Sequence, residues 1–131
     1  MRKSETLRGH GVFRTVTANG RRIDGKLIRS YSVISAGPAP SFTIGMSVSS
    51  RRLNAVQRNR IRRRMREAFS RERSRLADTV EASGVRLAAV FSFRPRNGDA
   101  MRMAAFSDLH ADVSSIIDRI ISRIRQQWPQ Q

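Results

Sequence analysis

The last third of the chain carries its most regular hydrophobic pattern. Apolar residues recur there at steps of three or four positions: Phe106, Leu109, Val113, Ile116, Ile117, Ile120, Ile121, Ile124 and Trp128. This spacing puts one apolar stripe along an α-helix, and Pro129 ends it because proline lacks the donor that a further turn needs. Ser107 is the expected N-cap. Other elements must cover a stripe of this length, so the chain has to fold around this helix.

Two segments in the first half of the chain have the pattern of strands. Residues 27–35 mix Leu, Ile, Tyr and Val with Ser and Arg, and residues 42–49 alternate apolar and small side chains with a period of two. The Gly-Pro-Ala-Pro sequence at 37–40 predicts a turn, across which we expect the two strands to pair antiparallel. A short helix is expected before them, at residues 11–18, ended by an Asn-Gly pair.

The second half of the chain adds a basic helix, an apolar strand and the amphipathic helix. Residues 55–73 are compatible with a helix, and residues 76–84 predict a loop with a helical turn. Residues 85–93 are apolar and β-prone. The order α-β-β-α-β-α predicts one α+β domain over residues 1–131, in which a small mixed sheet packs with helices.

Charge restricts the function more than any other property of the composition. Lys and Arg number 26 against 10 Asp and Glu, which gives a formal net charge of +16. Lys3 and Lys26 are the only lysines. Because guanidinium binds phosphate in a bidentate way, this balance favours nucleic acid as the partner. No apolar run approaches the roughly 20 residues that span a bilayer. The chain shows no signal-peptide pattern and no cysteine, which is compatible with a cytoplasmic location and no membrane partner.

The basic helix distributes its charges unevenly. On a helical wheel, a core-facing arc of about 100° holds Ile61, Met65, Ala68 and Phe69. The neighbouring flank carries Asn59, Arg62, Arg63, Arg66 and Arg73. Arginines also lie on the far side of the helix, together with Glu67. One flank is therefore a row of guanidinium groups without a carboxylate.

A solvated surface helix is the simpler interpretation of such a charge run. Like charges three or four residues apart, however, destabilise a helix by a few tenths of a kcal/mol per pair. Glu67 and Glu72 can offset only part of this repulsion. The row therefore favours a polyanionic partner. Asn59 adds a donor and an acceptor that can bond a base edge, a 2′-OH or a hydrated metal ion.

Residues 58–67, Arg-Asn-Arg-Ile-Arg-Arg-Arg-Met-Arg-Glu, resemble the RNR motif helix of the bacterial ribonuclease P protein family. The strand at 44–49 and the Ala-Val step at 55–56 are similar to what precedes that motif. Residues 7–22 resemble the N-terminal segment of the family. The resemblance covers essentially the whole chain and is most specific at the RNR block.

The resemblance implies both a fold and a function. The fold would contain a left-handed βαβ crossover, against the usual right-handed rule. The chain would be the noncatalytic protein subunit of ribonuclease P, assisting the catalytic RNA in removing the 5′ leader from precursor tRNA. Its partners would be that RNA subunit, with one protein per RNA, and precursor tRNA. The RNA subunit would hold most of the Mg²⁺, and no organic cofactor is implied.

The resemblance also assigns roles to particular residues. The expected RNA-binding residues are Arg51, Arg52, Arg58, Asn59, Arg60, Arg62, Arg63 and Arg66. Phe13 and Tyr31 correspond to the aromatic lining of the 5′-leader cleft, where bases could stack, although both positions also fit a core. Val16 stands where many members carry a second aromatic. Leu53 replaces a family glycine, so the loop before the helix is expected to differ.

A protein that cleaves RNA by itself would show clustered metal-binding carboxylates or a catalytic histidine pair. His10 and His110 lie in unrelated segments, and the acidic residues form no ligand spacing. Asp108, Asp112 and Asp118 are expected to solubilise the last helix, the first two also favouring its N-terminus. We therefore predict no catalytic or metal-binding residue in the protein.

Two alternatives remain open at this point. The first is a structural RNA-binding protein of the ribosomal-protein type, with no role in tRNA processing. The second is a DNA-binding module with the arginine helix in a major groove. Asn59 and Gln57 would be almost its only base-reading side chains, which argues instead for recognition of backbone and shape.

Overall fold

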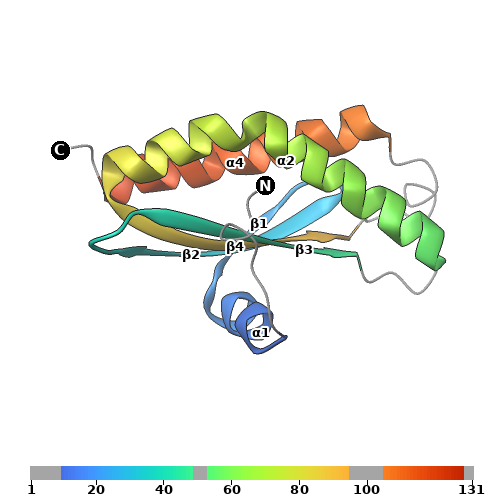
Figure 1. Ribbon diagram of the computed structural model, residues 1–131, viewed down its shortest axis with the longest axis horizontal. Coiled ribbons are helices and arrows are strands. Elements are labelled where there is room, and N and C mark those ends of the chain that lie inside the picture. Colours follow the sequence, from blue (N-terminus) through green and yellow to red (C-terminus); the bar gives the residue numbers. More distant parts are fainter. Residues whose placement is uncertain (1–9, 49–52, 95–104, 129–131) are drawn as a thin grey trace.

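A computed structural model describes residues 10–48, 53–94 and 105–128. The elements in chain order are α1 (His10–Asn19), β1 (Arg21–Asp24), β2 (Ile28–Ala36), β3 (Ser41–Val48), α2 (Ala55–Ser83), β4 (Val85–Phe93) and α4 (Phe106–Gln127). The strands form one mixed sheet in the order β1-β2-β4-β3. Helices α2 and α4 lie side by side over one face of the sheet, and α1 lies on the other (Figure 1). The predicted α+β fold with a mixed sheet is confirmed, with β1 as an additional strand.

The pairing of the strands corrects one prediction. β2 and β3 do not pair with each other, because β4 lies between them, antiparallel to β2 and parallel to β3. β4 is the most continuously apolar strand, and a strand at the centre of a helix-covered sheet is buried on both faces. Parallel neighbours need a crossover connection, and α2 supplies it between β3 and β4. The left-handed sense of that crossover stays a prediction.

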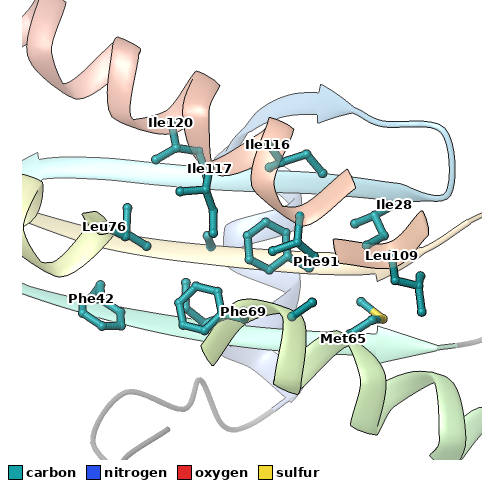
Figure 2. Packing of buried hydrophobic residues seen from close by; sticks show 14 of the residues in the cluster. Ile28, Phe42, Met65, Phe69, Leu76, Phe91, Leu109, Ile116, Ile117 and Ile120 are labelled. Carbon is teal, nitrogen blue, oxygen red and sulfur yellow. The ribbon is translucent and has the colours of Figure 1, made fainter. Parts of the chain in front are cut away.

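The main core lies between the sheet and the two long helices. Helix α2 packs chiefly on β3 and β4, whereas α4 packs on β2 and β1. The Phe69 ring of α2 has its centroid 6.2 Å from that of Phe42 and 6.1 Å from that of Phe91 (Figure 2). Ile61, Met65, Ala68 and Phe69 are all buried, as the wheel predicted. The apolar stripe of α4 is buried from Leu109 to Ile124.

Helix α2 is longer than predicted. It continues through residues 76–83, which we expected to form a loop with one helical turn. Leu76 and Val80 are buried and extend the apolar stripe by two more turns, so packing outweighs the weak local pattern. Gly84 then ends the helix with φ 65°, a left-handed conformation that glycine adopts without strain.

The start of α4 also differs from the prediction. Ala105, not Ser107, is the N-cap, and no side chain caps the helix. Asp112 is buried, and its carboxylate accepts hydrogen bonds from the backbone N–H groups of Lys26, Leu27 and Ile28 at 3.0, 2.6 and 2.9 Å. It therefore anchors the beginning of β2 under α4 instead of solubilising the helix. A Cβ at Gly25 would lie 2.6 Å from this carboxylate, so a glycine there permits the approach.

None of the described helices combines the length and apolar character that a membrane span requires.

Candidate nucleic-acid interface

The arginine-rich helix begins with a well-formed cap. The Asn54 side chain accepts a hydrogen bond from the Gln57 backbone N–H at 2.8 Å, and the Gln57 side chain accepts one from the Asn54 N–H at 3.0 Å. This reciprocal pair is a capping box. Gln57 is thus occupied at the helix start, which leaves Asn59 as the side chain suited to base or 2′-OH contacts. No acidic residue lies in the first turn, so the positive end of the helix dipole adds to the arginine charge.

The predicted arginine flank is present on α2 and points away from α4. Near its far end, the Arg73 guanidinium carbon lies 5.5 Å from the centroid of the Phe42 ring, which belongs to β3. Arg62 donates from Nη1 to the Asn59 Oδ1 at 3.0 Å, so these two side chains form one polar unit. Arg63 and Arg66 are exposed, and no carboxylate among the described residues pairs with them. The structure thus brings Asn59, Arg62, Arg63 and Arg66 together on one surface.

The remaining predicted RNA-binding residues differ in their surroundings. Arg58 is half-buried, and its Nη1 donates to the Leu53 carbonyl at 2.5 Å. Part of its hydrogen-bonding capacity therefore stabilises the start of the helix. Leu53 itself is buried in the core, which explains how a large side chain is accommodated just before the cap. Arg60 is exposed on another side of the helix. Arg51 and Arg52 lie outside the described residues.

The opposite flank of α2, which faces α4, has its charges paired. Arg75 Nε lies 2.6 Å from Glu72 Oε2, and Arg75 also forms an ion pair with Asp118 of α4. The Glu72 side chain is only 14% exposed. Burial acts to raise the pKa of Glu72, but hydrogen bonds from Arg75, Ser114 and His110 outweigh it and lower the pKa overall. This cluster therefore connects the two helices.

His110 has structural contacts and belongs to no metal-binding cluster among the described residues. Within the described ranges, no group of three or more His, Cys, Asp or Glu side chains could hold a metal ion. His110 Nε2 lies 3.0 Å from Glu72 Oε1, and the His110 ring stacks on Phe106 with centroids 5.8 Å apart. These contacts give His110 a structural place between α4 and α2. The backbone of His10 begins α1, and its side chain lies outside the description.

The predicted leader residues lie on the other face of the sheet. Val16 of α1 and Val90 of β4 are buried between that helix and the sheet, and Phe13 and Tyr31 pack around them while staying half-exposed. Phe13 lies directly over β3, since a Cβ at Gly45 would be 2.5 Å from its ring. Phe13 also lines an open hollow of about 310 Å³ with residues of α1 including Arg14. Both aromatics thus combine packing with exposure, and Val16 is a core residue.

A comparison with known families agrees with this architecture. A family model described as Ribonuclease P matches residues 1–121. The chain belongs to the ribonuclease P protein family. This membership connects it with ribonuclease P, tRNA processing and RNA binding, and with an RNA subunit and tRNA as partners. A search of curated proteins gave no match.

Solved structures of ribonuclease P proteins have the same fold. A Staphylococcus aureus RNase P protein has a TM-score of 0.69 at 18% identity, with 90% of this chain and 96% of that chain covered. The Thermotoga maritima RNase P protein has a TM-score of 0.63 at 16% identity, with 88% and 96% covered. At these identities the likeness concerns the fold. The arginine flank and the α1 face are therefore argued from this chain's own residues.

Proposed function

We propose that this chain is the noncatalytic protein subunit of ribonuclease P and assists the catalytic RNA in removing the 5′ leader from precursor tRNA. The observation that carries the proposal is the α2 flank of Asn59, Arg62, Arg63 and Arg66. It is a surface of guanidinium groups with one amide, paired with no carboxylate of the described residues, in a chain that belongs to the ribonuclease P protein family. Such a surface suits the phosphate backbone of a folded RNA.

The proposed contribution of the protein is electrostatic and positional. The arginines reduce the repulsion between the catalytic RNA and its substrate, two polyanions that must come into contact. Mg²⁺ is held mainly by the RNA subunit, and one protein binds one RNA. No step of bond cleavage is assigned to the protein, in keeping with the structural contacts of His110.

The 5′ leader would lie on the sheet face that carries α1. Phe13 and Tyr31 are half-exposed there, so their rings can stack with unpaired bases while their inner edges pack on Val16 and Val90. The α2 flank and the α1 face lie on opposite sides of the sheet (Figure 1). The protein can therefore contact the RNA subunit and the leader at the same time. Holding the leader aligns the scissile phosphate with the metal site of the RNA, which is catalysis by positioning.

The deciding experiment is reconstitution. The purified protein should restore leader cleavage to a bacterial ribonuclease P RNA at a low Mg²⁺ concentration at which that RNA alone is inactive. The Arg63→Gln/Arg66→Gln variant should need a higher protein or Mg²⁺ concentration for the same rate. If the folded wild-type protein binds RNA but never restores cleavage, the chain is a structural RNA-binding protein instead.

The leader contact has its own test. Tyr31→Ala should weaken binding of precursor tRNA by about 5- to 150-fold, because a good stack is worth roughly 1–3 kcal/mol. Mature tRNA lacks the leader, so its affinity should hardly change. Tyr31→Phe keeps the ring and is the matched control. An unchanged ratio of precursor to mature affinity in folded Tyr31→Ala would make Tyr31 a core residue only.

A further inference from the structure

A second basic surface lies far from the arginine flank, at the β1 edge of the sheet. A groove of about 600 Å³ runs between β1 and the second half of α4. Four arginines line it, and one of them, Arg22, is paired with Asp24. The other three are Arg21 from β1 and Arg119 and Arg123 from α4, and we call these three the groove arginines. Ser122 and Gln126 of α4 line the same groove and add neutral hydrogen-bonding groups.

Two carboxylates, Asp24 and Asp118, also line the groove, and both form ion pairs with arginines other than the three groove arginines. Asp24 Oδ2 lies 2.8 Å from Arg22 Nη2, and Asp24 Oδ1 lies 2.9 Å from Arg29 Nε. The Arg22 hydrogen bond, followed by that of Arg29, holds the pKa of Asp24 below its ordinary value. Asp118 is paired with Arg75 on the side toward α2. In the described part of the chain, no carboxylate lies within ion-pair distance of a groove arginine.

Two of the groove arginines are held in place by neutral acceptors. Arg123 donates from Nη1 to the Ser32 hydroxyl at 3.3 Å, and Arg119 donates from Nη1 to the Asp24 carbonyl at 3.2 Å. The Nε of Arg123 is buried and has no hydrogen-bond partner among the residues that the structure describes. Burial, and then the like charge of Arg21, lower the pKa of the Arg123 guanidinium. An arginine in this situation carries a desolvation cost that an anion in the groove would offset.

We propose that this groove binds a phosphate of an RNA backbone, as a second RNA contact separate from the α2 flank. The inference rests on the proposed RNA-binding function. Three unneutralised guanidinium groups on two elements suit the diester oxygens, and Ser122 and Gln126 suit a neighbouring ribose or phosphate. A membrane surface fits less well, because Val56, on α2, is the large hydrophobic residue that the described surface exposes.

The groove and the α2 flank must contact different RNA segments. Helix α2 lies over β3 and β4, whereas the groove lies beside β1, at the opposite edge of the sheet. Three strand spacings separate β1 from β3, which is roughly 14 Å. Substitutions at sites this far apart should act additively on the binding free energy. The RNA segment at the groove can belong to the catalytic RNA or to the precursor tRNA.

The test compares equal charge changes on one helix. Arg119→Gln and Arg123→Gln remove groove arginines, and Arg125→Gln removes an exposed α4 arginine that does not line the groove. Affinity is measured at several salt concentrations in two arms. In the first arm the protein binds a bacterial ribonuclease P RNA, and in the second the assembled complex binds precursor tRNA. Each groove variant should bind about 5- to 10-fold more weakly in one of these arms, with the log–log salt slope shallower by about 0.7–0.9. Arg125→Gln should change affinity less than about 2-fold.

The arm that responds identifies which RNA supplies the phosphate. Groove variants that fold normally and match Arg125→Gln in both arms would overturn the proposed groove site. The Arg63→Gln/Arg66→Gln variant separates this failure from that of the proposed function. If that variant loses affinity while the groove variants do not, only the groove proposal is wrong. If the wild-type protein does not bind ribonuclease P RNA at all, the function itself is wrong.

Discussion

The two ends of α2 use arginine for different purposes. Residues 55–66 contain six arginines and no acidic residue. Exposed members such as Arg63 and Arg66 face solvent, and no carboxylate in the described ranges pairs with them. In the second part of the helix, Arg71 pairs with Glu67, and Arg75 pairs with Glu72 and with Asp118 of α4. The same residue type is therefore available to an external anion at one end of the helix and takes part in the protein's own packing at the other.

The arginine-rich end of α2 has a cost in free energy that the fold tolerates. Like charges at three and four residues repel one another, and positive charge near a helix N-terminus opposes the helix dipole. The helix persists because the capping box secures its start and the buried residues from Ile61 to Val80 hold it on the sheet. A repulsive cluster supported by strong packing is what a preorganised polyanion site requires. Partner phosphates would relieve the repulsion on binding.

The largest expected effect is on RNA affinity. Arg63→Gln/Arg66→Gln should bind ribonuclease P RNA about 30- to 100-fold more weakly at moderate salt, with the salt slope shallower by about 1.5. Arg71→Gln should have a smaller effect, because Glu67 lies 3.4 Å from the Arg71 Nη2 and already offsets its charge. The single variants Arg66→Gln and Arg71→Gln remove one charge each, the first exposed and the second paired with Glu67. Equal losses of affinity for these two would remove the distinction between the two ends.

The free energy of unfolding should depend more on the paired arginines than on the exposed arginines that are expected to bind RNA. Arg75→Ala leaves the mostly buried Glu72 without its nearest cation and breaks the connection to Asp118, so unfolding in urea should become easier by about 2 kcal/mol. Arg66→Ala, at an exposed and unpaired position of the same helix, should stay within about 0.5 kcal/mol of wild type. If Arg66→Ala destabilises as strongly as Arg75→Ala, the flank is structural and not a binding surface.

This difference between the ends of α2 was only partly predictable from sequence. The core stripe and the arginine flank follow from helical geometry alone, and the structure has both. The contact of Arg75 with Glu72, three residues before it, is within the reach of a helical wheel. Its contacts with Asp118 and Ser114 were not predictable, because these residues come from a helix some forty residues later. The family resemblance gave the RNA-binding role, which no periodicity contains.

Contacts that are distant in sequence explain the other errors. Asp112 has the spacing of a surface residue beside the apolar stripe, yet three backbone donors 84 to 86 positions away bury it. β4 separates β2 from β3 because its two apolar faces need the centre of the sheet, whereas the short loop at 37–40 suggested a hairpin. β1 is a four-residue strand whose mixed polar sequence gives no alternating pattern. The groove arginines meet only when β1 and α4 pack together.

Acid should specifically weaken the contacts of Glu72 that connect the second part of α2 to α4. The pKa of Glu72 is lowered in the fold from an ordinary value near 4.5, so its stabilisation is complete above about pH 4.5 and is lost as pH falls through the lowered pKa. The unfolding free energy of wild type should therefore fall on acidification below about pH 4.5, and Glu72→Gln should show a shallower fall. Glu81→Gln, an exposed position on the same helix, removes the same charge and is the control. If the unfolding free energies of wild type and Glu72→Gln fall equally at low pH, the cluster does not hold α2 to α4 through this charge.

The smallest expected effect concerns Arg71, which marks the boundary between the two ends. Its guanidinium carbon lies 4.6 Å from the centroid of the Phe106 ring of α4, and its Nη2 pairs with Glu67. An exposed cation–π contact is worth about 0.5–1 kcal/mol.

A double-mutant cycle of Arg71→Ala and Phe106→Leu, followed by urea unfolding, should give a coupling energy of about 0.5 kcal/mol. Arg63 lies about two turns before Arg71 on α2, away from the Phe106 ring that Arg71 contacts, so Arg63→Ala in the same cycle should give no coupling. If both arginines couple equally to Phe106, the coupling does not come from the contact between Arg71 and the ring. A coupling for Arg71 alone would set the boundary between the binding and packing arginines at Glu67, where the first carboxylate of the helix appears.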